Sequence, residues 1–161
     1  MEEFITGALL ILFREEIKKY LDELATRSPA MNLANFSQIN LGEVIKIDSF
    51  PAFILTPLGW SKNSSEVSYT ESEFIEIMYR YQANIFIEGD DPEELELRAM
   101  RYREAVVELL RDNYKLGGVA LGVIVSSVDN YNLMSGECLE YGTRLSIDVT
   151  APHSLAAFKL P

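Results

Sequence analysis

The first hydrophobic pattern along the chain repeats every three to four residues and covers residues 3–26. Its apolar positions are Ile5, Leu9, Leu12, Phe13, Ile17, Tyr20, Leu21 and Leu24, and the charged residues of its second half, Glu15, Glu16, Lys18, Lys19, Asp22 and Glu23, fall mostly on the other side. Because an α-helix turns once in about 3.6 residues, this spacing places the apolar side chains on one stripe. Pro29 follows the pattern, and the residue before a proline is pushed out of the helical region. The pattern predicts an amphipathic helix over residues 3–26.

A second helix is expected from residue 92 to about residue 113. The segment Gly89–Glu94 supplies an aspartate cap, a proline in the first turn and carboxylates that complement the positive end of the helix dipole. The expected buried stripe contains Leu95, Ala99, Tyr102, Val106, Leu109 and Leu110. Lys115-Leu116-Gly117-Gly118 ends this helix, because glycine readily adopts the positive φ of a helix terminus.

Strict alternation of apolar and polar residues predicts two long strands, over residues 73–88 and 139–149. Their apolar positions are Ile75, Ile77, Tyr79, Tyr81, Ala83, Ile85 and Ile87 in the first, and Leu139, Tyr141, Thr143, Leu145, Ile147 and Val149 in the second. The usual strand has about five or six residues. The much longer segment 73–88 is therefore expected to extend beyond a small domain, with its first half in a protruding hairpin with residues 50–59 that a neighbouring molecule can contact.

The remaining segments are less regular. Residues 44–48 and 50–56 have the composition of strands, and Pro51 between them favours an edge strand or a bent one. Val119–Val128 is also expected to be a strand. Loops or turns are expected at residues 30–42, 60–72 and 129–137, the second of these as a flexible loop in the protruding hairpin, and residues 150–161 form a tail without a pattern of its own.

The expected element order is α-β-β-α-β-β in one domain that spans residues 1–161. Two helices that pack on one face of a mainly antiparallel β-sheet would bury both helix stripes and the apolar face of each strand. The sequence therefore predicts an α+β fold with a protruding long β-hairpin.

Composition and charge narrow the functional classes. Hydrophobic residues make up 48% of the chain, as in a globular protein, and no apolar run approaches the ~18 residues that cross a bilayer. The expected location is therefore the cytoplasm. The net charge of −11 disfavours tight binding to duplex DNA, whose affinity for proteins comes largely from Lys and Arg. The acidic excess is typical of a solvated surface, or of a wall that DNA slides past.

Cys138 and His153 are each the only residue of their type. A single cysteine forms no intrachain disulfide and no thiolate metal cluster. A single histidine in the C-terminal segment would join a catalytic triad only if that segment folded back over a serine. No catalytic, cofactor-binding or metal-binding residue is therefore expected, and the chain is not expected to be an enzyme.

An acidic cluster offers the only candidate metal site in the sequence: Glu88, Asp90, Asp91, Glu93 and Glu94. It lacks the alternate ligand positions and the central glycine of a calcium loop, and helix capping explains each member, so the capping interpretation is favoured. The glycines of residues 117–122 leave a helix and enter a strand, which is the reverse of a phosphate-binding loop. The carboxylates Glu137 and Glu140 are interpreted as a solvated edge.

Aromatic residues leave two alternatives open. Tyr79, Tyr81, Tyr102, Tyr131 and Tyr141 would suit a stacking platform for single-stranded nucleic acid, but the lysines and arginines such a site needs are not nearby. Packing in the core or at a protein interface is favoured for them. Trp60, next to Leu58 and a polar segment, is either a contact anchor or a buried core residue.

Two stretches of the chain resemble the tail-terminator and neck proteins of long-tailed bacteriophages. The first is Tyr79-Arg80-Tyr81-Gln82-Ala83-Asn84-Ile85-Phe86-Ile87, followed by Asp91-Pro92-Glu93 and the helix with Arg98, Tyr102 and Arg103. The second is Tyr141-Gly142-Thr143-Arg144-Leu145-Ser146-Ile147-Asp148-Val149. The resemblance covers roughly residues 3–25 and 73–150, and it contains no catalytic signature.

The resemblance implies a structural virion protein, a hexameric ring that caps the phage tail tube and joins it to the head-side connector or stopper. Its expected partners are copies of itself, the tail tube protein and that connector, while DNA passes through without specific binding. The expected location is the tail or neck of the virion, after assembly in the host cytoplasm. The alternatives are another head–tail neck or completion protein, a small ligand-binding regulatory domain of ferredoxin-like type, or an enzyme that uses carboxylates alone.

Overall fold

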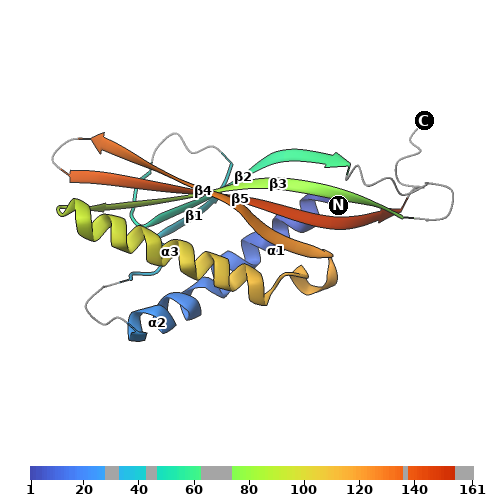
Figure 1. Ribbon diagram of the computed structural model, residues 1–161, viewed down its shortest axis with the longest axis horizontal. Helices are drawn as coiled ribbons and strands as arrows, with labels where there is room; N and C mark the ends of the chain where they lie inside the picture. The colour runs from blue at the N-terminus through green and yellow to red at the C-terminus, as the bar shows by residue number, and fades with distance from the viewer. Residues whose placement is uncertain (28–32, 43–46, 63–73, 136–137, 155–161) are drawn as a thin grey trace.

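The computed structural model describes residues 1–27, 33–42, 47–62, 74–135 and 138–154 of the chain (Figure 1). These residues form an α+β fold with three α-helices, one 3-10 helix and a five-stranded mixed sheet. In chain order the elements are α1 (Glu2–Glu15), α2 (Ile17–Arg27), β1 (Gln38–Leu41), β2 (Ala52–Lys62), β3 (Phe74–Gly89), α3 (Pro92–Asp112), η1 (Leu116–Gly118), β4 (Gly122–Ser135) and β5 (Cys138–Ser154).

The sheet has the strand order β1-β2-β3-β5-β4. Only β1 and β2 are parallel, and the other neighbours are antiparallel, as expected for a mainly antiparallel sheet. β3 pairs with β5 along its whole length, from Phe74 opposite Ser154 to Gly89 opposite Leu139. This long antiparallel ladder forms the centre of the sheet.

All three helices lie on the same side of the sheet (Figure 1). The alternating residues of β3 that face them are buried, and the residues between are half-buried or exposed, with Glu76, Arg80 and Glu88 exposed. Rings from both layers meet in the core, where the centroids of Phe13 on α1 and Phe53 on β2 lie 4.5 Å apart. The expected two-layer packing is therefore confirmed.

The first helix differs from the prediction. Glu16, with φ −108° and ψ −22°, ends α1, and α2 begins at Ile17, so two helices replace the single one expected over residues 3–26. The apolar stripe continues across the break, because Phe13, Ile17 and Tyr20 are all buried. The pattern of apolar residues therefore predicted the buried face but did not reveal the break.

Four strand predictions need correction. β1 lies within residues 30–42, which were expected to be a loop, and its four residues are too few to show a period. Ile47 and Asp48 lie outside any strand, while the rest of the strand expected at 44–48 is mostly outside the described residues. β4 continues to Ser135 and β5 to Ser154. Their antiparallel partners supply backbone hydrogen bonds there, although these residues do not alternate between apolar and polar. The predicted element order α-β-β-α-β-β was therefore incomplete, because it missed the break between α1 and α2 and the strand β1.

β3 has sixteen residues, the length predicted from its alternation. Its neighbours β2 and β5 occupy both of its edges over Ile77–Phe86, so this part of β3 has no free edge for a neighbouring molecule. The ends of β2, β3 and β5 reach beyond α1 at the right of Figure 1. Trp60–Lys62 belong to β2, and the rest of the expected loop at 60–72 lies outside the described residues.

Candidate assembly surface

The large apolar side chains that the described residues expose fall into two groups, defined by the elements that carry them. The α1–β2 group lies on α1, β1 and β2 and comprises Met1, Phe4, Ile11, Leu41, Leu58 and Trp60. The α3–β4 group lies on α3, β4 and the turn between them and comprises Leu97, Met100, Val107, Tyr114, Leu121, Ile124 and Val128. β1 and β4 are the two outermost strands, but the sheet does not separate the two groups, because Ile11 on α1 lines one cavity together with Asn113 and Gly117, which follow α3.

Helix α1 has no charged residue between Glu3 and Arg14. It buries Ile5, Leu9 and Phe13 against the sheet, yet Phe4 is 73% exposed and Ile11 58% exposed on its other side. A helix that is apolar on all sides is normally buried on all sides. The single chain therefore leaves two large apolar side chains of α1 exposed to water.

A buried hydrogen bond fixes the orientation of α1. The Thr6 hydroxyl donates to the carbonyl oxygen of Glu2 at 2.8 Å. This bond uses the only proton of the Thr6 hydroxyl. The Tyr81 hydroxyl on β3 lies 2.9 Å from the Thr6 oxygen and must therefore donate to it. Burial raises the pKa of Tyr81, which keeps the phenol protonated. The bond allows only one face of α1 to point away from the sheet.

Two cavities flank the exposed face of α1. One, of about 460 Å³, separates α1 from β1 and β2 and is lined by Glu2, Glu3, Thr6, Gly7, Leu10, Leu41 and Pro57. The other, of about 340 Å³, separates α1 from η1 and is lined by Ala8, Ile11, Leu12, Glu15, Glu16, Asn113, Leu116 and Gly117. The Thr6 hydroxyl is already bonded within the domain, and the other lining of the first cavity is largely apolar. The second cavity is lined by three polar residues, Glu15, Glu16 and Asn113, and the Asn113 amide already donates to the Leu109 carbonyl at 2.9 Å.

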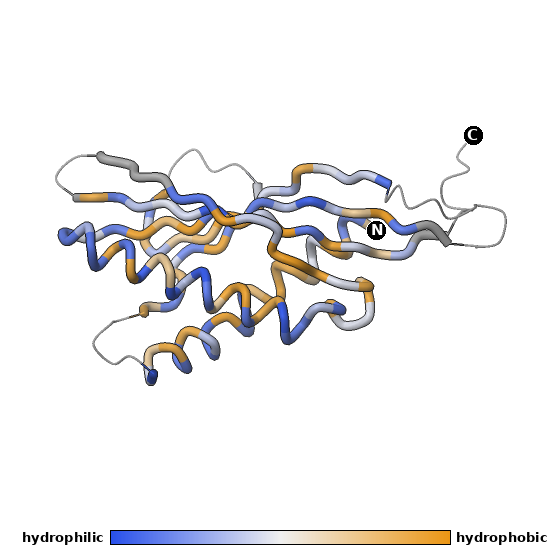
Figure 2. The backbone as a smooth tube through the Cα atoms, viewed as in Figure 1, coloured by the Kyte–Doolittle hydropathy of each residue, from blue (hydrophilic) through white to orange (hydrophobic). Residues whose placement is uncertain are grey.

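The two edges of the sheet are protected to different extents. At one edge, β1 has only four residues, and Arg14 on α1 donates to the carbonyl of Ile39 at 3.3 Å. At the other edge, β4 has fourteen residues, and no strand in the described part of the chain pairs with its outer side. Its segment Gly122–Val128 carries no charge, and Figure 2 shows the start of β4 in the hydrophobic colour. A long apolar edge strand without such protection is a site for pairing with another chain.

Polar contacts join α3 to β4 and β5 behind the α3–β4 group. The Arg103 guanidinium donates to the side-chain oxygen of Asn130 and, at 3.4 Å, to the Thr143 hydroxyl. At the end of α3, Lys115 Nζ lies 5.7 Å from the centroid of the Tyr114 ring, and the Arg111 side chain is 71% exposed. The Arg111 Nε lies 3.8 Å from the Asp112 carboxylate, and the exposed Glu104 lies two helical turns before Arg111 on the same side of α3, so this end carries both charges.

In the acidic cluster at residues 88–94, Asp91 has the capping role that the sequence predicted. The side chain of Asp91 accepts a hydrogen bond of 3.1 Å from the Glu93 amide and caps α3. No three or more His, Cys, Asp or Glu side chains of the described residues are grouped so as to hold a metal ion. Gly117 and Gly118 have φ of 70° and 98°, the left-handed conformation expected after the helix.

Four of the five tyrosines considered above, Tyr79, Tyr81, Tyr102 and Tyr141, are buried in the core, which excludes them from a stacking platform. The side chains of Tyr131, Cys138 and His153 lie outside the described residues, as does Glu137. Trp60 is 51% exposed and Leu58 56% exposed. The buried alternative for Trp60 is therefore wrong, because half of its side chain surface is exposed.

The exposed face of α1 and the unpaired edge of β4 were not among the sites predicted from sequence. The signal for the first was present, since ten consecutive uncharged residues, Phe4–Phe13, exceed what one buried stripe requires. The second depends on strand order, which a single sequence does not determine.

None of the helices in the described part of the chain is both long enough and apolar enough to cross a bilayer. No protein-family model matches the chain, and no curated protein sequence is recognisably similar to it.

Proposed function

We propose that the chain is a tail terminator of a long-tailed bacteriophage, a structural virion protein whose copies form a ring at the end of the tail tube. The observation that carries the proposal is the presence of two dissimilar groups of exposed apolar side chains, one on α1, β1 and β2 and the other on α3 and β4. The resemblance of Tyr79–Ile87 and Tyr141–Val149 to tail-terminator and neck proteins supplies the biological setting.

Dissimilar surfaces favour a head-to-tail contact between copies. In a symmetric dimer the same patch meets itself, whereas a contact between two different patches leaves both free again on the outer molecules. Such a contact repeats until it closes into a ring or grows as a filament. A stable contact of this kind buries on the order of 1,600 Å² in total. A ring of about six copies uses the α1–β2 group of each chain against the α3–β4 group of the next.

The long ladder suits a ring subunit mechanically. β3 and β5 pair without interruption over sixteen residue positions, which makes the centre of the sheet stiff along its length. The ends of β2, β3 and β5 extend past α1, and we propose that this protruding hairpin region clasps a neighbouring copy or the tail tube. The clasp would act through its exposed side chains, Leu58 and Trp60 among them, rather than through the edges of β3.

The charge of the chain suits a channel for DNA. In a ring, each copy contributes a net charge of −11. This negative charge would repel the DNA phosphates instead of binding them. DNA then passes from the head-side connector into the tail tube without being held. These two structures are the proposed partners, and the tail or neck of the virion is the proposed location, after assembly in the host cytoplasm.

Electron microscopy of tail tubes tests the proposal. The purified chain is added to tubes growing from the tail-tube protein encoded beside it in the same genome. We expect one ring at one end of each tube and arrest of further elongation. Tubes that keep growing with bare ends, while the chain stays in solution, would refute the function. Binding only to the head-side connector would instead identify another neck protein of similar fold.

A further inference from the structure

We infer that the outward face of α3 pairs with the same face of α3 in a second copy of this chain, with the two helices antiparallel. The pairing goes beyond the proposed ring and does not require it, and only its effect on assembly rests on the proposed function. The face consists of six exposed side chains, which we call the α3 stripe: Leu97, Met100, Glu104, Val107, Arg111 and Tyr114.

The α3 stripe has the spacing of a helix–helix contact. Its positions are separated alternately by three and four residues, which keeps them on one side of the helix. At a rise of 1.5 Å per residue, the stripe from residue 97 to residue 114 is about 26 Å long. Its four apolar members, Leu97, Met100, Val107 and Tyr114, are 38–47% exposed. Each of them therefore keeps a large part of its surface accessible to a partner.

The carboxylates next to the stripe on the last turns of α3 make contacts with α2. Glu108 lies 3.5 Å from the Arg27 guanidinium, and Asp112 accepts a hydrogen bond of 2.9 Å from the Tyr20 hydroxyl. Both carboxylates are thereby directed towards α2. The charges of the stripe itself are therefore those of Glu104 and Arg111.

The contact of Arg111 with Asp112 leaves Arg111 able to bind a second carboxylate. The Arg111 Nε lies 3.8 Å from the Asp112 carboxylate, and the two side chains are 71% and 53% exposed. An ion pair this exposed contributes little to stability. The terminal nitrogens of a guanidinium carry four of its five N–H donors, so Arg111 can keep its contact with Asp112 and donate elsewhere.

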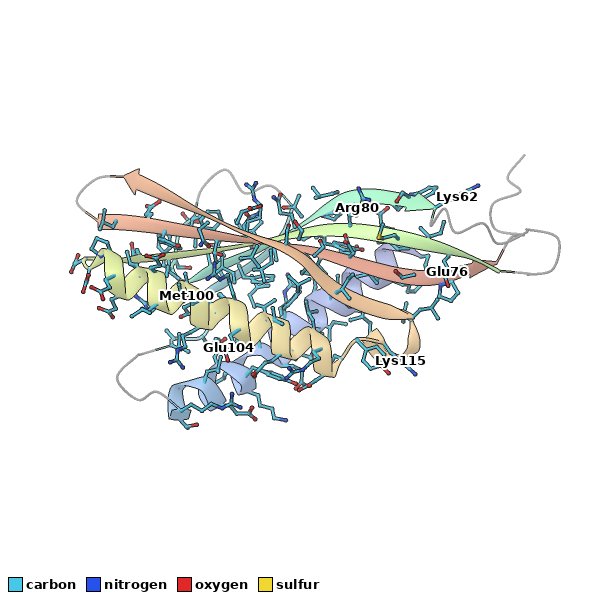
Figure 3. All side chains as sticks on the ribbon, in the orientation of Figure 1. Lys62, Glu76, Arg80, Met100, Glu104 and Lys115 are labelled. Carbon is cyan, nitrogen blue, oxygen red and sulfur yellow. The ribbon has the colours of Figure 1, made fainter. Side chains whose placement is uncertain are left out.

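The order of the charges identifies the partner. Along the stripe the acid Glu104 precedes the base Arg111, with Val107 between them, and Figure 3 labels Glu104 on α3. If two α3 helices cross antiparallel near Val107, Glu104 of each copy lies within about one helical turn of Arg111 of the other. The same arrangement places Met100 opposite Tyr114. Because the stripe complements its own reverse, it fits a second copy about a two-fold axis.

The parallel arrangement of the two helices is unfavourable. It would place Glu104 against Glu104 and Arg111 against Arg111, and like charges that face each other across an interface repel. The charges of the stripe therefore select the antiparallel pair.

The pair is short-lived and competes with the ring. A contact through one face of a single helix is smaller than a standard interface, which buries roughly 1,600 Å². The stripe also supplies the α3 members of the α3–β4 group. A chain whose stripe is paired therefore cannot use it in the proposed ring contact, and the pair of free chains gives way to the ring during assembly.

Disulfide trapping tests the contact, because it records short-lived pairs. Cys138, the only cysteine, is first replaced by serine in all variants. Val107→Cys, close to the two-fold axis, should then form a linked dimer under mild oxidation, since a disulfide requires Cα atoms about 4.4–6.8 Å apart. Met100→Cys alone should stay monomeric. Mixed with Tyr114→Cys, it should form a linked dimer that contains one chain of each.

The matched control is Glu94→Cys, which is exposed on α3 outside the stripe and should not link under the same conditions. In the Val107→Cys chain, the further change Glu104→Arg should slow linking roughly tenfold. Adding Arg111→Glu should restore the rate, because opposite charges face each other again. Circular dichroism checks that every variant is folded.

The outcomes separate the pairing from the ring. A folded Val107→Cys chain that links no faster than Glu94→Cys would overturn the inference and leave the proposed function intact. Self-linking of Met100→Cys, or a rate that Arg111→Glu does not restore, would also overturn it. The linked dimer should join no ring until it is reduced, and its entry into rings would refute the competition. A parent chain that pairs but never closes into a ring would instead refute the proposed function.

Discussion

The hydroxyl oxygens of Thr6 and Tyr81 lie 2.9 Å apart in the interior and join the first helix to the central strand across 75 residues of sequence. Because Thr6 points into the sheet, Phe4 and Ile11 on the other side of α1 must point outwards. The same bond that satisfies a buried polar pair therefore also presents the apolar face on which assembly is proposed to depend.

Removal of the threonine hydroxyl should destabilise the fold. Thr6→Val keeps the shape but leaves the buried Tyr81 hydroxyl without its acceptor, at a cost of about 1–3 kcal/mol in the free energy of unfolding. Tyr81→Phe should cost about 1 kcal/mol, since Thr6 keeps its bond to the Glu2 carbonyl. The double variant should cost clearly less than the sum of the two. Denaturant unfolding of the monomeric chain measures the cycle, and strict additivity would mean that the two hydroxyls do not interact.

Alkaline pH should destabilise the fold through buried tyrosines. Burial and the hydrogen bond to Asp112 raise the pKa of Tyr20 to about 12, and burial together with the nearby Glu2 raises the pKa of Tyr79 to about 12. In the unfolded chain both ionise near pH 10, about the ordinary value. The native state therefore holds more protons between these values, so stability falls as pH rises from about 10 to about 12. Unfolding by denaturant at a series of pH values should show this loss, and Tyr20→Phe should reduce its slope.

Replacing Asp91 by another capping residue should preserve the stability of the fold. Asp91→Ala removes the acceptor for the Glu93 amide and should cost about 1 kcal/mol, whereas Asp91→Asn should retain most of the stability because asparagine caps equally well. Thermal unfolding followed by circular dichroism measures both. If Asp91 acted as a metal ligand instead, added calcium or magnesium would stabilise the parent chain and the asparagine variant would lose that effect.

Replacing Gly7 and Gly118 by alanine should change the stability of the fold in opposite directions. Gly7 lies in helix α1 with open space around its Cβ position, so Gly7→Ala should stabilise the single chain by about 0.5–1 kcal/mol. Gly118 has a φ of 98°, which an L side chain adopts only with strain, so Gly118→Ala should destabilise it by about 1–2 kcal/mol. Both are measured by denaturant unfolding of the monomer. A stabilising Gly118→Ala would show that the turn after α3 is less constrained than its φ indicates.

The buried faces of the fold were predictable from sequence, because burial imposes a period on the chain. The alternation in β3 and the stripe through Phe13 and Ile17 both identified residues that the structure buries. The break at Glu16 was not predictable, since the stripe passes through it unchanged. β1 was also missed, because its four residues depend on a partner strand rather than on a pattern of their own.

The candidate surface was less predictable than the fold. Exposure of Trp60 was one of two alternatives, and its 51% exposed side chain decides between them. The α3–β4 group was not apparent because Val107 and Val128 are distant in sequence, and only the strand order β5-β4 and the packing of α3 place their elements together. Apolar residues in a sequence do not distinguish a core from an interface until the fold determines which of them stay outside.

The mass of the unmodified chain in solution, measured by sedimentation velocity or light scattering over a wide concentration range, tests head-to-tail assembly most directly. The proposed tail-terminator ring predicts a closed species of about six times the 18.2 kDa chain mass, formed cooperatively and without a stable dimer. A chain that stays at 18.2 kDa at every concentration, or that stops at a symmetric dimer, would contradict it.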